Sequence, residues 1–534
     1  MPLRWVPRSV VRRVAGGPPT LQAGLRSRPG ELDPPTIHAV LELSLRVGEA
    51  MLSLGAAAVD VTLAIRRVLR SFGLRGAQVD LTFTSITVSY DRGDDAYPLT
   101  MMRIVAERIP DYGRLQDVVE LAREVGERTV APEEAREQVD AAHDRFDAIV
   151  SAPQTYRRWV VTAALSTLAG AVAVLLGGGP AVALVAAATT AVIDRVIWFL
   201  SLRGLPAFFL QAAGAAVAAL VAVALFLAGP ALPFDPAVLP PSLVVASGIV
   251  VLLAGLSLVG AAEDAISGFP ITAGARAFEV FVLTLGIVVG IGFVLDVARR
   301  LGVPLVLLDP PQNTSPLILQ VLAAGTVALA WAVASYARPR AVVVAAAVGG
   351  VSWSVLSVMT DLGVGPAVAS AIAATVVGFL SEWASPRLKV PSIVTSVCGI
   401  VPLLPGLAIY RGLFDLVEGT SGIGVLPGVS GLFGALMIGL GIAAGVTLGE
   451  FLGAPLRLGT RGGGRSRSAA VRGVTGRAPH QLLRRARSTA AARDGQAATG
   501  LGVTGIAGAG RPGGVVDEPP GAPTLDPHLR HSPR

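Results

Sequence analysis

The alternation of apolar and polar positions divides the chain into an amphipathic amino-terminal part and a long series of apolar blocks. From Trp159 onward, the apolar blocks are each close to the length of roughly 20 residues that a helix needs to cross a bilayer. We predict transmembrane helices at residues 159–177, 181–201, 206–228, 242–262, 277–297, 316–336, 340–359, 366–384, 392–410 and 430–454. The pattern therefore predicts a multi-pass α-helical membrane protein with about ten transmembrane helices.

Residues 36–152 have a different pattern, which predicts a small cytoplasmic α/β domain ahead of the membrane part. Helices are predicted there at residues 36–54, 57–72, 114–129 and 132–151. Apolar and polar residues alternate over 79–90, with a change of phase at Thr84 and Ser85. This predicts one strand with a bulge at those two residues, and a second strand is predicted near 97–105.

Composition supports the membrane assignment and marks the two ends of the chain as different. Of the 534 residues, 52% are hydrophobic and 15% are charged, which is more apolar sequence than a soluble globule of this size needs. Residues 1–35 are rich in Arg, Pro and Gly and lack the continuous apolar core of a signal peptide, so we predict a disordered basic leader. Residues 456–534 are Gly- and Arg-rich without periodicity, which predicts a disordered tail.

The net charge of +7 comes from an excess of arginine. In a membrane protein, this excess favours contacts with anionic lipid and a fixed orientation over nucleic-acid binding, and the basic tail lacks interleaved aromatic residues. If the amino-terminal domain is cytoplasmic, most loop arginines fall on the cytoplasmic side, whereas Arg299, Arg300 and Arg411 fall on the outer side. We therefore predict a cell-membrane protein with both termini in the cytoplasm.

One motif occurs twice in the apolar part, as LLAGLSLVGAAEDAISG at residues 252–268 and as LLPGLAIYRGLFDLVEG at residues 403–419. A gapless alignment of the two copies places Asp264 opposite Asp415. The motif lies in the fourth predicted helix of the first half and in the same helix of the second half. The five-helix halves are residues 157–300 and 312–455. An odd number of helices per half makes the second half enter the membrane from the opposite side, which predicts the inverted repeat of secondary transporters.

Gly255, Pro405 and Gly406 are the predicted unwinding points of this motif. A proline removes a backbone donor and a glycine loosens the helix, so freed backbone groups can meet the ammonium and carboxylate of an amino acid. The alternative is close helix packing by small residues. Ala254 stands opposite Pro405, which puts a sharp break of the first copy in doubt. We expect the second copy to be more sharply broken and to hold substrate more tightly.

Charged residues inside predicted membrane helices are the candidate binding residues, because they are costly there unless paired or hydrated. We predict that Asp264 or Asp415 binds the substrate amine or a proton; alternatively, both cap helix ends at the membrane surface. Asp194 beside Arg195 forms either a buried or an interfacial pair. Arg411 could bind the substrate carboxylate in a bidentate contact, or anchor the outer surface. Weaker candidates near helix ends are Glu263, Glu279, Glu382 and Glu450.

The amino-terminal domain carries little sign of catalysis. The sequence contains no G-x-S-x-G, HExxH or P-loop motif, and its single cysteine, Cys398, lies in an apolar segment. His38, His143 and Asp144 lie on predicted helices and are expected to be solvated. We therefore expect no catalytic residues, no metal and no cofactor, and the protein is not predicted to be an enzyme.

Three segments resemble the bacterial threonine/serine exporter family. They are VDVTLAIRRVLRSFGL followed by VDLTFTSITVSY, RGLPAFFLQAAGA, and PLLPGLAIYRGLFDLVEG. The resemblance covers about residues 36–455, in the family's order of a cytoplasmic domain and two sets of five helices. It implies export of L-threonine and L-serine, driven by the proton motive force.

Two other function classes stay open alongside the exporter. A channel or scaffold would lack saturable, gradient-driven flux, and an enzyme would show activity in the cytoplasmic domain. The predicted partners are a small amino acid, protons and membrane lipid. Substrate preference, the coupling ion and homo-oligomerisation are left open.

Overall fold

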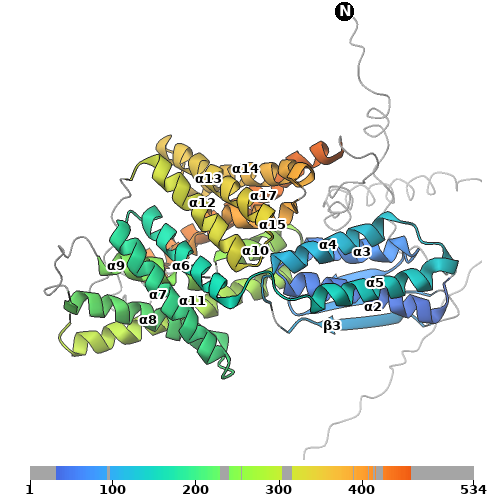
Figure 1. The fold of residues 1–534 in the computed structure, drawn as a ribbon, viewed down its shortest axis with the longest axis horizontal. Helices are drawn as coiled ribbons and strands as arrows, with labels where there is room; N and C mark the ends of the chain where they lie inside the picture. Colours follow the sequence, from blue (N-terminus) through green and yellow to red (C-terminus); the bar gives the residue numbers. More distant parts are fainter. Residues whose placement is uncertain are drawn as a thin grey trace, which may run out of the picture. The chain divides into compact units, whose positions relative to one another are not determined.

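The computed structural model describes residues 32–92, 97–106, 108–228, 240–253, 255–303, 315–388, 390–406, 408–409, 411–412, 415 and 425–458. Figure 1 shows the order of its helices and strands along the chain. Nearly all of the predicted leader and tail lie outside the described residues.

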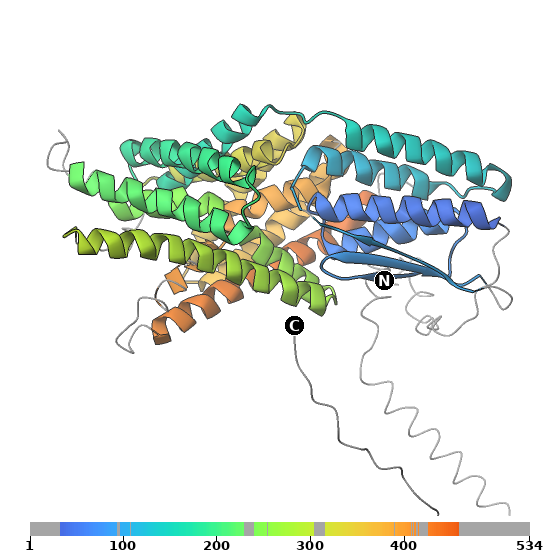
Figure 2. The ribbon, with the colours of Figure 1, turned by 90° about the horizontal axis from the view of Figure 1, so that it is seen from below.

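The amino-terminal region has four helices on one side of a three-stranded antiparallel sheet (Figure 2). The helices are α2 (Pro34–Ser53), α3 (Ala58–Ser71), α4 (Tyr112–Glu127) and α5 (Ala135–Ser151), with the 3-10 turn η1 (Pro132–Glu134) before α5. The strands, in their order across the sheet, are β1 (Gln78–Leu81), β2 (Ser85–Tyr90) and β3 (Leu99–Ile104). Ile86, Val88 and Tyr90 of β2 are buried and form one core with Leu41 and Ile65 of the helices.

The prediction of one bulged strand over residues 79–90 is wrong, because β1 and β2 are separate strands joined by a tight turn. The Thr82 N–H donates to the carbonyl of Ser85 at 2.9 Å, and Leu81 lies opposite Ile86. Opposed residues of an antiparallel pair point to the same face of the sheet. The change of phase in the apolar alternation therefore keeps the apolar residues of both strands on the face that the helices cover. A bulge within a single strand would have had the same effect on the alternation.

Eight helices among the described residues are long and apolar enough to cross a membrane, or nine spans if one bent pair is counted as a span. The eight are α6 (Arg158–Leu175), α7 (Pro180–Ser201), α8 (Ala207–Ala228), α11 (Pro270–Arg300), α12 (Leu317–Ala334), α13 (Pro339–Asp361), α14 (Pro366–Leu388) and α17 (Val425–Leu458). The protein is thus a multi-pass α-helical membrane protein. The two further spans that the sequence predicts, 242–262 and 392–410, are not continuous helices.

These two segments are interrupted at matching positions. The first consists of α9 (Pro241–Ile249), the 3-10 turn η4 (Val250–Leu252) and α10 (Gly255–Ile266), and the second begins with α15 (Ser392–Ile400) and η5 (Val401–Leu403). The corresponding elements have equal lengths and lie 151 residues apart, from Pro241 to Ser392. Leu253 and Leu404, which follow η4 and η5, are both extended, with φ of −72° and −63°.

The first copy is sharply bent although it has Ala254 in the place of Pro405. The helical pieces before and after its break are inclined by 50°. The expectation that the first copy lacks a sharp break, because it lacks the proline, is therefore wrong. An extended Leu253 ends the first piece and Gly255 begins a new helix, so no proline is needed. Much of the second copy beyond Gly406 lies outside the described residues, and the relative sharpness of the two breaks stays a prediction.

Glycines bring the third and fifth helices of each predicted half into close contact. A Cβ placed on Gly290 of α11 would lie 2.1 Å from the carbonyl oxygen of Ala212 in α8. In the second half, a Cβ on Gly445 of α17 would lie 2.2 Å from the carbonyl oxygen of Ala371 in α14. Only glycine permits such an approach, which is the usual way in which small residues pack membrane helices.

The amino-terminal region packs directly on the membrane helices. The Tyr112 N–H at the start of α4 donates to the carbonyl of Ser335 at 2.8 Å, and Arg338 pairs with Asp117 at 2.6 Å. The apolar core of the region continues into residues of α12, α13 and α15, among them Cys398. This contact places the loops before α3 and α4 against the membrane part, where they help to line a cavity.

Candidate functional site

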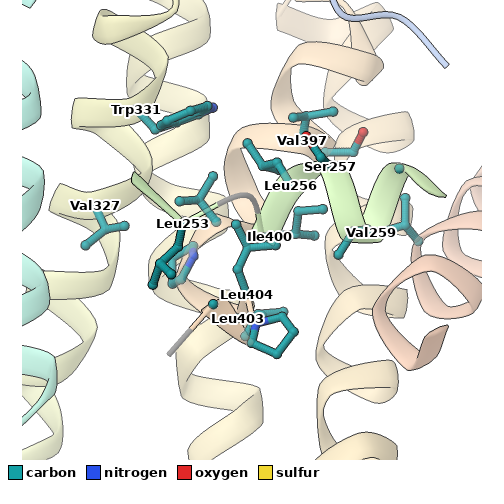
Figure 3. A pocket seen from close by; sticks show the side chains of 18 of the residues that line it. Leu253, Leu256, Ser257, Val259, Val327, Trp331, Val397, Ile400, Leu403 and Leu404 are labelled. Carbon is teal, nitrogen blue, oxygen red and sulfur yellow. The ribbon is translucent and has the colours of Figure 1, made fainter. Parts of the chain in front are cut away.

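A cavity of about 790 Å³ lies at the interruptions of the two broken segments. Its walls come from the membrane helices α6, α10–α15 and α17, and from the starts of α3 and α4 with the loops that precede them. The middle of the cavity is apolar, with side chains that are labelled in Figure 3: Leu253, Leu256, Val327, Trp331, Ile400, Leu403 and Leu404. A largely apolar cavity with a few charged groups is the usual form of a site for a small molecule.

The two broken segments touch each other through reciprocal glycine contacts. A Cβ on Gly255 would lie 3.1 Å from the Cβ of Leu404, and a Cβ on Gly406 would lie 3.0 Å from the Cβ of Leu253. In the 151-residue alignment, the two glycines are equivalent and so are the two leucines. The contact is therefore of the kind that a two-fold axis generates, in which each partner presents the same surface.

Charged residues line the part of the cavity that faces the amino-terminal region. They are Asp60, Arg108, Glu263, Arg276 and Glu279. Arg108 also lies over the ring of Phe83, 3.9 Å from its centroid. Burial, together with the nearby charge of Arg276, lowers the pKa of Arg108 to about 10, so it remains a cation at neutral pH. Both signs of charge are thus present beside an apolar chamber.

Asp264 on α10 joins this charged part of the cavity to helix α3. Its side chain is fully buried, its Oδ1 accepts the N–H of Ala58 at 3.2 Å, and its Oδ2 lies 3.0 Å from Nη1 of Arg276. Ala57, which precedes α3, offers no side-chain acceptor to the first turn of that helix. The Asp264 carboxylate, 206 residues away in the chain, accepts the free N–H in place of a side chain at Ala57. It also places a negative charge at the positive end of the α3 dipole.

Gly260 leaves the space that the Arg276 side chain occupies. A Cβ on Gly260 would lie 2.8 Å from Nη1 of Arg276. In the repeat alignment, Arg411 stands at the position of Gly260. The first copy therefore has a glycine with the arginine supplied from α11, whereas the second copy has an arginine in the motif itself.

Two family models match the chain, and together they cover most of the residues that the structure describes. Residues 42–298 match the family described as "Putative threonine/serine exporter", and residues 320–451 match the one described as "Threonine/Serine exporter". A "Probable threonine/serine exporter" of Mycobacterium tuberculosis is 38% identical over 446 residues, which cover 82% of this chain and 81% of the relative. The chain belongs to the threonine/serine exporter family.

A second relative supports the same assignment to the threonine/serine exporter family. The "Threonine/serine exporter" of Corynebacterium glutamicum is 35% identical over 426 residues, which cover 79% of this chain and 84% of the relative. No solved structure matches the chain. The family resemblance inferred from three short segments is confirmed.

The predicted site residues of this family member lie in different surroundings. Gly255, Pro405 and Gly406 line the cavity, and Asp264 contacts its Arg276. Asp415 is exposed and Arg411 half-buried, and neither is among the described residues that line the cavity. The structure thus separates Asp264 from Asp415, although the repeat aligns them.

Asp194 forms a separate polar cluster at the ends of α6 and α7. It is buried, pairs with Arg158 and with Arg195, and accepts a hydrogen bond from Thr162 at 2.7 Å. The sequence left open whether Asp194 and Arg195 form a buried or an interfacial pair. The structure shows a buried carboxylate that pairs with two exposed guanidinium groups. The cluster does not belong to the described lining of the cavity.

Two arginines in the cavity were not predicted as site residues. Arg108 lies in a loop of the amino-terminal region, and Arg276 lies near the start of α11. The weaker candidates Glu263, Glu279 and Glu450 do line the cavity, whereas Glu382 is buried outside it. The sequence did contain an indication of the role of Arg276. An aspartate inside a membrane helix needs a cationic partner, and Arg276 follows Asp264 after one short predicted loop.

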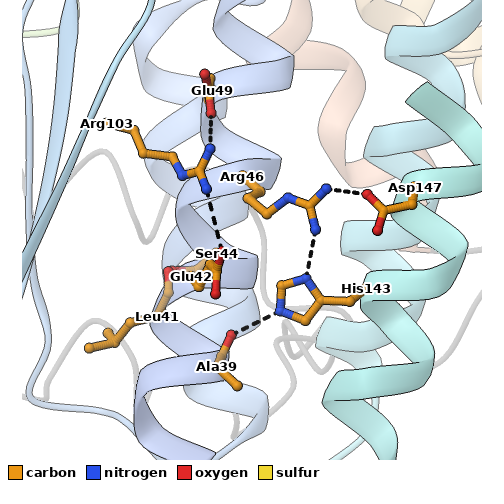
Figure 4. Close-up of polar contacts among 9 residues, drawn as sticks. All are labelled: Ala39, Leu41, Glu42, Ser44, Arg46, Glu49, Arg103, His143 and Asp147. Atoms are coloured by element: carbon orange, nitrogen blue, oxygen red, sulfur yellow. Dashed lines mark hydrogen bonds and ion pairs between the residues drawn. The ribbon is translucent and has the colours of Figure 1, made fainter. Parts of the chain in front are cut away.

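The amino-terminal region contains a polar network between α2, α5 and β3 (Figure 4). The ring of His143 lies 3.0 Å from Nη1 of Arg46 and 3.2 Å from the carbonyl oxygen of Ala39. Arg46 also pairs with Asp147. His143 is less solvated than expected, because it is half-buried and contacts Arg46 and the Ala39 carbonyl of α2, whereas His38 and Asp144 are exposed. No cluster of metal-ligating side chains occurs among the described residues.

Proposed function

We propose that this protein exports threonine and serine from the cytoplasm and that the cavity at the two broken segments is the substrate chamber. The observation that carries the proposal is the chamber itself, in which an apolar middle adjoins charged groups of both signs at interrupted membrane helices. Family relatives that are named threonine/serine exporters supply the substrate class. Charged groups next to interrupted helices are how many transporters bind small zwitterions.

The proposed mechanism is alternating access between two inverted halves, residues 157–300 and 312–455. Three observations support it: the matching interruptions 151 residues apart, the reciprocal glycine contacts and the similar glycine seams of the third and fifth helices. In such an architecture, one half rocks against the other and exposes the site to each side in turn. The amino-terminal region, residues 36–152, would then be a cytoplasmic α/β domain that covers one side of the chamber, with both termini in the cytoplasm.

We further propose that export is coupled to protons. Asp264 is the fully buried acid of the repeated motif, and Glu263 and Glu279 line the chamber beside it. A carboxylate in such a place changes charge with protonation, and its state alters the balance between two conformations. Asp415 remains the equivalent candidate in the second half.

The proposal is tested by measuring efflux from cells. Cells with and without the protein are loaded with threonine- or serine-containing dipeptides, and external threonine and serine are followed over time. We expect faster, saturable efflux with the protein, and a lower rate after an uncoupler is added. Equal efflux of both amino acids from the two cell types would remove the exporter proposal, and a linear, non-saturable dependence would favour the channel alternative.

A further inference from the structure

Arg276 is buried but makes little use of its hydrogen-bonding capacity. Its side chain is 11% exposed and lines the chamber. Its ion-pair partner among the described residues is Asp264, at 3.0 Å, yet Oδ2 of Asp264 accepts no hydrogen bond. A guanidinium carries five N–H donors, and buried donors are normally satisfied. The nitrogens of Arg276 are not among the fully enclosed unpaired atoms of the described residues, so those that face the chamber are open to an acceptor that enters it.

The surroundings of Arg276 indicate what this acceptor is. A second guanidinium, that of Arg108, lines the same part of the chamber and is close enough for the charge of Arg276 to affect its pKa. Two cations facing one chamber favour an anion. The acids Glu263 and Glu279 line the chamber as well and can accept from an ammonium group. A small molecule with a carboxylate and an ammonium on one carbon matches this pattern.

Asp264 fixes the position of the Arg276 guanidinium. Its Oδ1 is held by the Ala58 N–H at the start of α3, so that Oδ2 is directed at Nη1 of Arg276. Gly260 keeps the space beside this nitrogen free of a side chain. Asp264 thus positions the guanidinium of Arg276, and the first turn of α3 in turn positions the carboxylate of Asp264.

We propose that Arg276 binds the carboxylate of the transported α-amino acid and that Asp264 is its positioning residue. This inference rests on the proposed export of threonine and serine. A planar guanidinium can contact both oxygens of a carboxylate, which lysine or an amide side chain cannot do. The inference replaces Arg411, which is half-buried and outside the described lining of the chamber, as the carboxylate-binding residue.

The test compares threonine with threonine amide, which keeps the ammonium and the hydroxyl but lacks the carboxylate. Binding of both compounds is measured on the purified full-length protein by ligand-dependent thermal stabilisation. For the unmodified protein, we expect threonine to bind at least about tenfold more tightly than its amide, as a charged hydrogen-bonded pair implies. In Arg276→Gln, we expect this ratio to fall severalfold towards one, because the carboxylate loses its bidentate partner and only the more distant charge of Arg108 remains.

Arg158→Gln is the matched control. Arg158 is also an arginine of a membrane helix paired with a buried aspartate, Asp194, but it lies outside the described lining of the chamber. We expect it to lower stability without changing the preference for threonine over the amide. A purely structural role of Arg276 would give the same result in Arg276→Gln as in Arg158→Gln.

Arg276→Lys keeps the test decisive if the glutamine variant does not fold. It retains the positive charge but not the planar fork, and we expect a preference for threonine between those of the unmodified protein and of Arg276→Gln. An unchanged preference in either folded variant would overturn the inference. So would equal binding of threonine and its amide to a protein that exports threonine. If the unmodified protein exports neither threonine nor serine, the proposed function itself fails.

Discussion

Gly255 at the start of α10 lies directly against Leu404 at the interruption of the other broken segment, and a Cβ on the glycine would be 3.1 Å from the Cβ of the leucine. Gly406 and Leu253 repeat the contact at 3.0 Å. These distances are shorter than most Cβ contacts in proteins, so the two interruptions interlock with no spare room. The walls of the chamber therefore depend on two residues that have no side chain.

We predict that Gly255→Val and Gly406→Val each lower the free energy of unfolding by about 1–3 kcal/mol, the usual cost of overpacking. Alanine at either position should cost less, because the leucine can yield by a few tenths of an ångström. Thermal unfolding of the purified protein measures the effect. Gly292→Val on α11 is the control, since a Cβ there meets nothing within 4 Å. If it is as destabilising as the two test variants, the proposed close contact is not the cause.

We predict that Asp264→Asn is far more destabilising than Asp415→Asn. Asparagine can still accept from the Ala58 N–H but leaves the buried Arg276 without its counter-charge, which costs about 3–5 kcal/mol. Asp415 is exposed, so its replacement should change stability by less than about 0.5 kcal/mol.

Thermal unfolding and efflux are measured on both aspartate variants. Similar losses of stability would contradict the different environments of the two residues. Efflux by Asp415→Asn decides its proposed role in coupling: intact transport with intact pH dependence would mean that Asp415 is not the proton carrier.

We predict that Gly445→Leu prevents correct packing of α17 on α14. A Cβ at this glycine would lie 2.2 Å from the carbonyl oxygen of Ala371, and backbone cannot move aside without separating the helices. Gly434→Leu on the same helix is the control, because nothing lies within 4 Å of its Cβ position. The yield of monodisperse protein after size-exclusion chromatography should fall for the first variant and stay the same for the second.

We predict that Cys398, the single cysteine of the chain, reacts with a maleimide only after unfolding. Its side chain is 0% exposed and belongs to the core that α2–α5 share with α12, α13 and α15. A buried thiol in apolar surroundings is unreactive. Ala337→Arg, a substitution in the same core, should detach the amino-terminal region and speed the labelling. Fast labelling of the unmodified protein under native conditions would contradict this packing.

Local patterns were sufficient for most elements of the fold. Apolar runs predicted the eight long membrane helices, because the length of a spanning helix follows from the thickness of the bilayer. The ends of α11 and α17 were missed by up to about seven residues, because these two helices are longer than the bilayer requires. The alternation over residues 79–90 predicted a sheet but not its hairpin, because a turn and a bulge leave the same change of phase. The break after Leu253 was underestimated, because it depends on backbone conformation and not on a proline.

The sequence by itself determined the family, the membrane location, and the pairing of Asp264 with Asp415 and of Gly255 with Gly406 as repeated positions. Only the tertiary structure decided that Asp264 is buried between α3 and Arg276 while Asp415 is exposed. The reason is that the surroundings of a side chain come from segments distant in the chain, here 206 residues for the hydrogen bond to Ala58. A repeat in sequence preserves backbone positions, whereas burial and charge depend on what packs against each copy, and here the start of α3 packs against Asp264 of the first copy.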